Sequence, residues 1–231
     1  MNSFLEGRVI LINKPFRWTS FDAVNKVKGI INRSEKACSE RFKLKIGHAG
    51  TLDPLATGLL ILCTGKFTKR IEEFQAQEKE YTGTFFLGAT TPCFDMEQEV
   101  NANYPIEHIT PELIYEAAKK LTGILQQIPP VFSAVKIQGR RAYDLARKGQ
   151  APEMQPKTIT ISVFEITRIE MPYVDYRVVC SKGTYIRSLA RDFGLSLNSG
   201  AYVFALCRTR IGEFRIEQAQ EIEAFEKKIQ G

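Results

Sequence analysis

The apolar residues of this chain recur at two spacings, one typical of strands and the other typical of amphipathic helices. Continuous apolar runs at 8–12 and 59–63 predict buried strands. Runs that alternate, or that are rich in aromatic and β-branched residues, predict further strands at 79–87, 159–169, 175–180 and 201–210. Apolar residues three to four positions apart predict helices at about 20–32, 67–75, 111–121 and 184–193, and another at the C-terminal end. We therefore expect a sheet with several antiparallel neighbours, accompanied by helices.

Local capping signals support several of these helices. Thr19 and Asp22 form a capping box for the first helix, and Thr110 caps a helix that Gly123 ends. Thr184 is expected to cap the next helix through its hydroxyl. The apolar stripe of the first helix contains Phe21, Val24, Val27 and Ile30, and that of the C-terminal helix contains Ala219, Ile222 and Phe225.

The stretch 46–62, which reads IGHAGTLDPLATGLLIL, combines turn-forming residues with the second apolar run. Pro54 fixes its own φ and moves Asp53 out of the helical region, and the glycines of the stretch permit close backbone approach. Asp53 is therefore held by stiff backbone on both sides, as a nucleophile or general base requires. The alternative is a purely structural loop, because aspartate before proline is also ordinary turn chemistry.

Composition adds weak constraints on the compartment and the partner. The 231 residues are 44% hydrophobic, enough for a core, and a net charge of +6 with a pI near 9.0 indicates an anionic partner without requiring one. The five cysteines contain no close pair, which suits a reducing compartment. The N-terminus resembles neither a secretory signal nor a membrane span, so we expect a cytoplasmic protein.

Two segments are rich in basic residues. Residues 14–45 carry nine lysines and arginines against three acids, either as a solvated face or as an approach path for phosphates. Residues 129–157 lie between prolines and carry Lys136, Arg140 and Arg141 near an aromatic residue, Tyr143. Such a segment suits an arm that contacts an RNA backbone, and an ordinary surface excursion is the alternative.

The string GHAGTLDPLATGLL closely resembles the signature loop of the bacterial tRNA pseudouridine-55 synthases, the TruB family of RNA-modifying enzymes. The NKP turn followed by WTSFD, the KEY before a strand, SAVKIQGRRAYDLARKG and KGTYIRSLARD are also similar to the family, in the same order. The resemblance implies an α+β pseudouridine synthase fold, with a mixed, largely antiparallel central sheet flanked by helices and an inserted arm at 129–157. Arg17 departs from the family, which frequently has glycine there.

The resemblance also implies roles for individual residues. Asp53 would be the catalytic nucleophile, Arg187 would pair with it, and Tyr81 would stack on the flipped uracil and transfer a proton. Without the resemblance, Tyr81 would be an ordinary core tyrosine and Arg187 part of a solvated helix face. The implied substrate-binding residues are His48, which fills the vacated stack, Lys14 near the site, Leu206 at its floor, and Lys136, Arg140 and Arg141 on the arm.

The implied reaction is the isomerisation of uridine 55 in the T-arm of tRNA to pseudouridine. We expect no metal or organic cofactor, no membrane association, and a monomer whose partner is tRNA. Residues 1–231 would form one catalytic domain, without a separate C-terminal RNA-binding domain.

Three alternatives remain open at this point. A non-catalytic RNA-binding module would explain the basic arm but would gain nothing from Asp53. A glycosidase-like hydrolase would explain Asp53, but such enzymes typically use two carboxylates and the loop offers one. A pseudouridine synthase subunit that works with guide RNA is the third, although the PLATGLL ending of the loop resembles the bacterial enzymes.

Overall fold

The computed structural model describes residues 4–36, 44–133, 136–137, 140–141 and 152–230, and the chain divides into two compact units. The first unit contains Met1–Tyr81 and Leu206–Gly231, and the second contains Thr82–Ala205. Strands β4 (Lys79–Leu87) and β12 (Ala201–Ile211) each contribute residues to both units. The prediction of a single catalytic domain remains a prediction.

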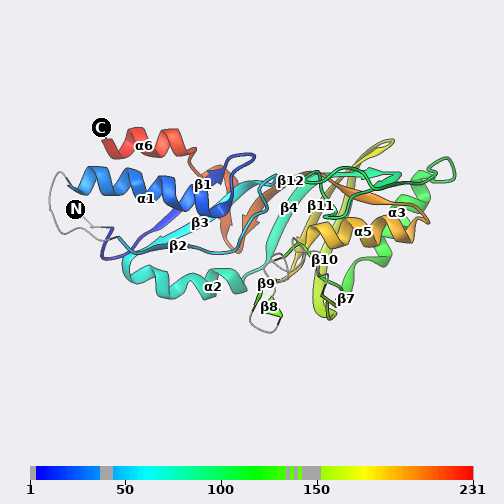
Figure 1. Ribbon diagram of the computed structural model, residues 1–231, viewed down its shortest axis with the longest axis horizontal. Helices are drawn as coiled ribbons and strands as arrows, with labels where there is room; N and C mark the ends of the chain where they lie inside the picture. The colour runs from blue at the N-terminus through cyan, green and yellow to red at the C-terminus, as the bar shows by residue number, and fades with distance from the viewer. Residues whose placement is uncertain (1–3, 37–43, 134–135, 138–139, 142–151, 231) are drawn as a thin grey trace. The chain divides into compact units, whose positions relative to one another are not determined.

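The first unit is built on an antiparallel pair of buried strands, β1 (Val9–Lys14) and β3 (Thr57–Thr64). The strand order is β1-β3-β12, and β3 pairs in parallel with β12. Two short strands complete this part, β2 (Ile46–His48) on β3 and β13 (Phe214–Arg215) on β12. Its helices are α1 (Ser20–Lys36), α2 (Ile71–Ala76) after a 3-10 turn at Gly65–Arg70, and α6 (Ile222–Gln230) (Figure 1).

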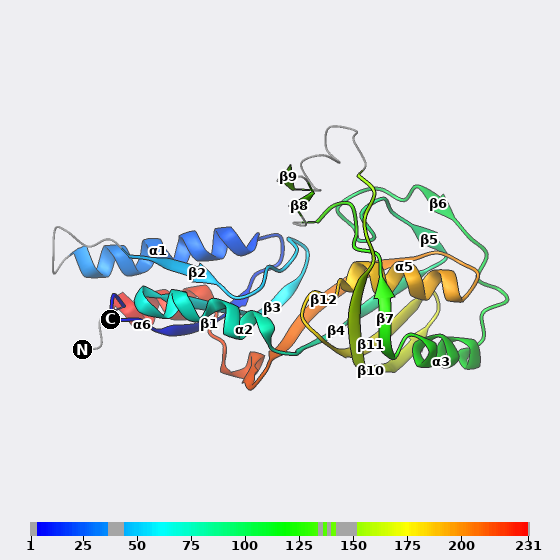
Figure 2. The same cartoon turned by 90° about the horizontal axis from the view of Figure 1, so that it is seen from below.

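Helices α1 and α6 lie side by side in both views (Figures 1 and 2). Ile222 and Phe225 of α6 are buried in the same core as the apolar face of α1, as predicted. The predicted stripe is wrong at Phe21, which is 66% exposed, because the buried face runs through Ser20 instead. It is also wrong at Ala219, which has extended backbone and lies before α6 begins.

The second unit is a sheet in the order β12-β4-β11-β10-β7. Helices α3 (Pro111–Lys120) and α5 (Ile186–Ser196) lie close together in Figure 2, and α3 packs against β10. Phe85 packs its ring against Tyr176 and Phe193, with centroid distances of 4.0 and 5.5 Å. The remaining strands are β5 (Ala89–Thr90), β6 (Ala102–Asn103), β7 (Gly123–Gln127), β8 (Lys136–Ile137), β9 (Arg140–Arg141), β10 (Lys157–Glu170) and β11 (Tyr173–Cys180).

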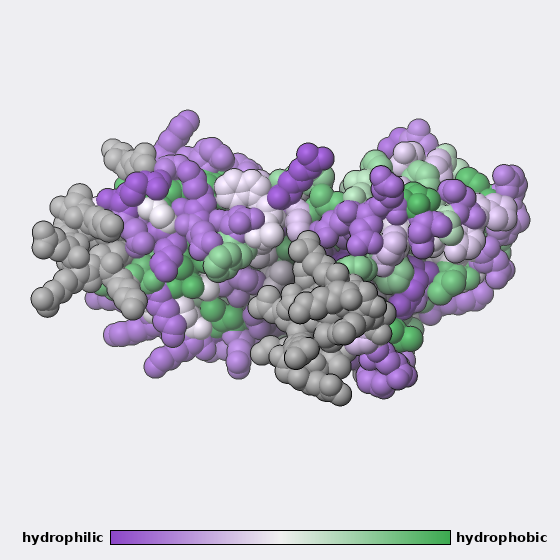
Figure 3. All heavy atoms as spheres, viewed as in Figure 1, coloured by the Kyte–Doolittle hydropathy of each residue, from purple (hydrophilic) through white to green (hydrophobic). Residues whose placement is uncertain are grey.

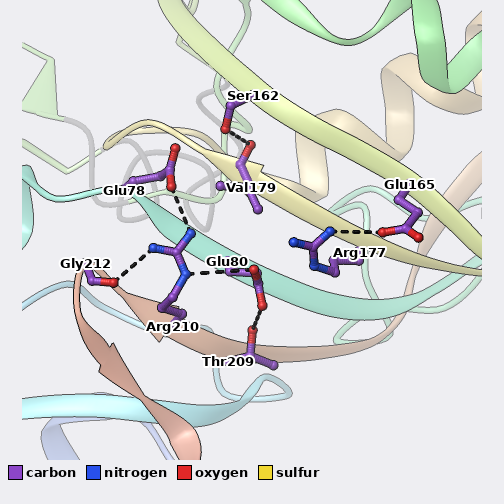
Figure 4. Close-up of polar contacts among 9 residues, drawn as sticks. All are labelled: Glu78, Glu80, Ser162, Glu165, Arg177, Val179, Thr209, Arg210 and Gly212. Atoms are coloured by element: carbon purple, nitrogen blue, oxygen red, sulfur yellow. Dashed lines mark hydrogen bonds and ion pairs between the residues drawn. The ribbon is translucent and has the colours of Figure 1, made fainter.

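Side-chain bonds reinforce neighbouring strands inside each unit (Figure 4). In the second unit the β10–β11 register shifts between Ile161 and Val163, and the Ser162 hydroxyl there donates to the Val179 carbonyl at 3.2 Å. In the first unit Arg210 forms ion pairs with Glu78 and Glu80, at 2.8 and 3.8 Å. The Ser162 bond joins the two strands where their backbone ladder is irregular, and the Arg210 ion pairs link β12 to β4 and to Glu78, the residue before it.

Hydrophilic side chains cover most of the face drawn in Figure 3, with hydrophobic side chains in separate small patches. Among the described residues, no helix is long and apolar enough to cross a membrane.

Most predicted elements are confirmed, and the helix signals explain where several of them begin. The Thr19 amide donates to the Asp22 carboxylate at 2.8 Å and the Asp22 amide to the Thr19 hydroxyl at 3.0 Å, so the capping box is confirmed. Thr110 also caps α3 as predicted. The cap predicted at Thr184 is wrong, because α5 begins at Ile186 and the Thr184 hydroxyl donates to the Ser181 carbonyl.

Arg17 has a φ of 66°, in the left-handed region that favours glycine. The turn between β1 and α1 therefore has, at Arg17, a backbone conformation that a glycine adopts readily. Of the predicted arm, the backbone pair β8–β9 is described. Residues 134–135, 138–139 and 142–151, together with the side chains of Lys136, Arg140 and Arg141, lie outside the described part of the chain.

Gly58 and Gly123 provide a matched test of how closely β3 and β12 approach. Both have strongly positive φ, 104° and 110°, but a Cβ on Gly58 would lie 2.4 Å from the Arg208 carbonyl oxygen, whereas a Cβ on Gly123 would meet nothing within 4 Å. We expect Gly58→Ala to lower the free energy of unfolding by about 1–3 kcal/mol more than Gly123→Ala does, since only Gly58→Ala adds overpacking to backbone strain. Chemical denaturation of both variants measures the difference. Equal losses in the free energy of unfolding would show that β3 and β12 can move apart to accommodate the added methyl group without destabilising the protein.

Candidate active site

Asp53 lies in the connection between two paired strands of the first unit. His48 of β2 pairs with Leu62 of β3, and the Ala49 amide donates to the Ile61 carbonyl at 2.9 Å. The chain leaves this pair, passes through Asp53 and returns at Thr57, with a turn closed by the Ala56 amide on the Asp53 carbonyl. Asp53 is half-buried. The loop is therefore anchored at both ends, as the apolar run predicted.

The residue before Asp53 is fixed by Ser20, the first residue of α1. The Ser20 hydroxyl accepts from the Leu52 amide at 2.8 Å and donates to the Leu52 carbonyl at 3.2 Å. Ser20 is 2% exposed and Leu52 is 3% exposed. Because both polar groups of the Leu52 main chain are satisfied by one buried hydroxyl, the backbone entering Asp53 has little freedom to rotate.

Lys14 fixes the residue after Asp53. Its side chain is fully buried, and its ammonium group donates to the carbonyls of Pro15, Trp18 and Pro54. The bond to the Pro54 carbonyl is 3.2 Å long and joins the end of β1 to the loop. The expectation that Lys14 lies near Asp53 agrees with this geometry, while its predicted contact with substrate remains a prediction.

Arg208 of β12 is a second buried cation beneath the same loop. It is 1% exposed, and its guanidinium donates to the Leu59 carbonyl at 2.9 Å and to the Gly50 carbonyl at 3.0 Å. These carbonyls lie on either side of Asp53 in the chain. The backbone of Arg208 pairs with Gly58, the glycine that permits this approach.

The two buried cations set the electrostatics of the loop. Burial lowers the pKa of Lys14 from 10.5 to about 8, opposed by the Asp53 carboxylate and assisted by the positive charge of Arg208. Burial, followed by the charge of Arg208, also lowers the pKa of His48 below its ordinary value. His48 is therefore neutral at pH 7, and its ring can present an uncharged aromatic face.

Tyr81 and Leu206 belong to the same unit as Asp53. Tyr81 is 9% exposed in β4, where the neighbouring Glu80 carboxylate accepts from the Thr209 hydroxyl of β12. The Leu206 carbonyl accepts from the Thr57 hydroxyl at 3.4 Å, so this part of β12 lies beside the end of the Asp53 loop. The catalytic and floor roles of these two residues remain predictions.

Arg187 belongs to the second unit and is 6% exposed, so the alternative that it lies on a solvated helix face is wrong. Its Nε lies 3.6 Å from an Asp95 carboxylate oxygen, and the guanidinium donates to the carbonyls of Cys93 at 3.2 Å and Phe132 at 2.9 Å. The predicted pairing of Arg187 with Asp53 involves residues of different units and remains a prediction.

Sequence reasoning missed Ser20, Arg208 and Asp95. Ser20 stood at the start of a predicted helix, and Arg208 stood within the strand predicted at 201–210. The available signal for Arg208 was the pair Gly50 and Gly58, since glycines that permit close approach require a neighbour to approach. Asp95 carries no comparable signal, because it lies in a turn region where aspartate is common.

Comparison with known proteins agrees with these observations. The family model described as "TruB family pseudouridylate synthase (N terminal domain)" matches residues 36–186. A protein of Flavobacterium johnsoniae named tRNA pseudouridine synthase B is 54% identical over 98% of this chain and 98% of its own length. A protein of the same name from Phocaeicola vulgatus is 55% identical over 96% of this chain and 93% of its own.

A solved structure gives the fold independently. The chain is similar to one in the crystal structure of a Cbf5-Nop10-Gar1 complex, with 28% identity and a TM-score of 0.73, over 97% of this chain and 55% of that one. The predicted α+β pseudouridine synthase fold is confirmed. The sequence and structural matches together establish that the chain belongs to the TruB family of pseudouridylate synthases and is an isomerase.

Proposed function

We propose that this protein converts uridine 55 in the T-arm of tRNA to pseudouridine, acting in the cytoplasm as a monomer with Asp53 as its nucleophile. The observation that carries the proposal is the Asp53 loop, whose backbone is bonded on both sides by buried cations. The similar proteins of Flavobacterium johnsoniae and Phocaeicola vulgatus are named as tRNA pseudouridine synthases, which supports tRNA as the substrate.

The reaction breaks the bond between the ribose C1′ and uracil N1 and forms a bond between C1′ and C5. A carboxylate suits the first step, because it can attack C1′ or shield the positive charge that develops there. The proton on C5 must then leave while uracil N1 gains one, and Tyr81 is our candidate for moving the C5 proton. The uracil is kept and rotated between the two steps, so no atom is gained or lost overall.

Lys14 and Arg208 would hold the loop in place while the substrate reacts. Catalytic groups must be held to within a fraction of an ångström, and a loop bonded through Leu52, Pro54, Gly50 and Leu59 meets that need. Moving the target uracil out of its stack costs a few kcal/mol. The neutral, half-buried ring of His48 is suited to stack in the position that the uracil leaves. The basic residues of β8 and β9 would contact the RNA backbone.

Purified protein with unmodified tRNA should produce pseudouridine at position 55 and release no uracil. An isolated T-arm hairpin should react within about tenfold of intact tRNA, a difference of about 1.4 kcal/mol in transition-state binding. Modification at another position would contradict the T-arm proposal, and free uracil would identify a hydrolase instead.

Asp53→Asn should abolish the reaction, because it removes the nucleophile while preserving the shape of the loop. We expect the single-turnover rate to fall by at least about a thousandfold, with tRNA affinity within about threefold of the unchanged protein. Mass spectrometry must confirm that the asparagine has not deamidated. A rate within tenfold of the unchanged protein would remove Asp53 from the mechanism.

Lys14 should impose an upper pH limit on the rate. Its folded-state pKa is lowered to about 8, so the ammonium is charged below that pH and loses its proton as the pH rises through it. We expect the single-turnover rate to fall by up to about tenfold between pH 7 and pH 9, and Lys14→Met to be slow at pH 7 without this step.

Lys227→Met is the matched control, since Lys227 is an exposed lysine of α6. It should retain both the rate at pH 7 and the fall above pH 8. A Lys14→Met profile that still falls above pH 8 would assign the limit to a different group.

A further inference from the structure

Gln127, the last residue of β7, is buried at 3% exposure and bonds one residue through both the oxygen and the nitrogen of its side-chain amide. Its Oε1 accepts from the Tyr185 amide at 2.8 Å, and its Nε2 donates to the Tyr185 carbonyl at 3.1 Å. The side chain therefore bonds Tyr185 as a neighbouring strand would, through both main-chain groups. Tyr185 is the N-cap of α5, and its own side chain makes no capping hydrogen bond.

The segment that begins at Gln127 reaches the first turn of α5 at two further points. The Ser188 hydroxyl donates to the Ile128 carbonyl at 2.8 Å, and the Arg187 guanidinium donates to the Phe132 carbonyl at 2.9 Å. Arg187 lies two residues after Tyr185. The direction in which its side chain leaves the helix therefore depends on how the Tyr185 backbone is held.

We propose that Gln127 is a positioning residue for Arg187, acting through the Tyr185 main chain. The inference rests on the proposed function, which gives Arg187 its catalytic role. A guanidinium displaced by about 1 Å can cost a hundredfold in rate, while substrate contacts made elsewhere remain intact. Loss of the Gln127 bonds should thus slow the chemical step and leave RNA affinity almost unchanged.

The two hydrogen bonds between Gln127 and the Tyr185 main chain form a clamp. The substitution Gln127→Glu makes this clamp sensitive to pH. The ionised carboxylate keeps the acceptor for the Tyr185 amide but places a negative oxygen against the Tyr185 carbonyl, whereas the protonated acid restores a donor there. Gln127 lines a surface hollow, and the charged side chains that also line it are Arg191 and Asp192, which pair with each other at 2.7 Å. Arg187 faces Asp95. With both arginines faced by carboxylates, burial should dominate and raise the pKa of the introduced acid.

The experiment compares Gln127→Met, Gln127→Glu and Gln126→Met in full-length protein, using single-turnover kinetics and tRNA binding at pH 6 and pH 8. Gln126 is the matched control, because it is the adjacent residue of β7 and its exposed amide donates to the Thr158 hydroxyl. Thermal unfolding confirms that each variant is folded. The exchange rate of the Tyr185 amide proton, followed by NMR, reports the clamp without reference to activity.

We expect Gln127→Met to react at least about tenfold more slowly with affinity within threefold, and Gln126→Met to match the unchanged protein. The rate of Gln127→Glu, divided by that of the unchanged protein at the same pH, should rise from pH 8 to pH 6. A normal rate for Gln127→Met, or a loss confined to affinity, would overturn the proposal.

The failure of this inference can be told apart from the failure of the proposed function. If the unchanged protein forms no pseudouridine in tRNA, the proposed function is wrong, and with it the role given to Gln127. Suppose instead that the unchanged protein is active, and that Gln127→Met speeds up exchange of the Tyr185 amide proton but forms pseudouridine at the normal rate. The clamp then exists but does not position Arg187, and only this inference fails.

Discussion

Irregular segments in both units depend on hydrogen bonds from buried cations to main-chain carbonyls, and the Asp53 loop of the first unit is one of them. Lys14 and Arg208 of the first unit and Arg187 of the second are each at most 6% exposed. Each donates to two or more main-chain carbonyl oxygens, which, except for that of Leu59 in β3, belong to irregular segments. Burying a charge is costly unless its hydrogen bonds are made. The irregular backbone has the complementary problem, since its carbonyls lack ladder partners. The cations and the loops therefore satisfy each other.

This arrangement explains why the site can be rigid without regular secondary structure. The Asp53 loop is contacted from outside by residues of β1, α1 and β12, which help to set its shape. Burial beneath the loop, together with the positive charge of Arg208, lowers the pKa of Lys14 and of His48. Loop geometry and loop electrostatics thus have one cause, and a change to either cation alters both.

The sequence predicted regular elements well because their signals are local. The span of β4 and the cap of α3 follow from residues within a few positions of each other. The loop partners could not be predicted in the same way, because Arg208 lies 158 residues from the Gly50 carbonyl that it contacts. Asp53 was identified through family resemblance, whereas Ser20, Arg208 and Asp95 required the fold. The Thr184 cap failed because Gln127, distant in sequence, bonds the helix start instead.

The type of side chain at each support follows from the main-chain groups left unpaired. Where the bond is to a carbonyl alone, as at Pro54, Gly50 and Phe132, the partner is a lysine or arginine, which donates and cannot accept. Leu52 and Tyr185 each present an amide as well as a carbonyl, so a cation could satisfy only half of either residue. The groups found there, the Ser20 hydroxyl and the Gln127 amide, both donate and accept. In each unit, neutral residues are therefore as necessary as the cations, because they alone can bond both groups of one peptide residue.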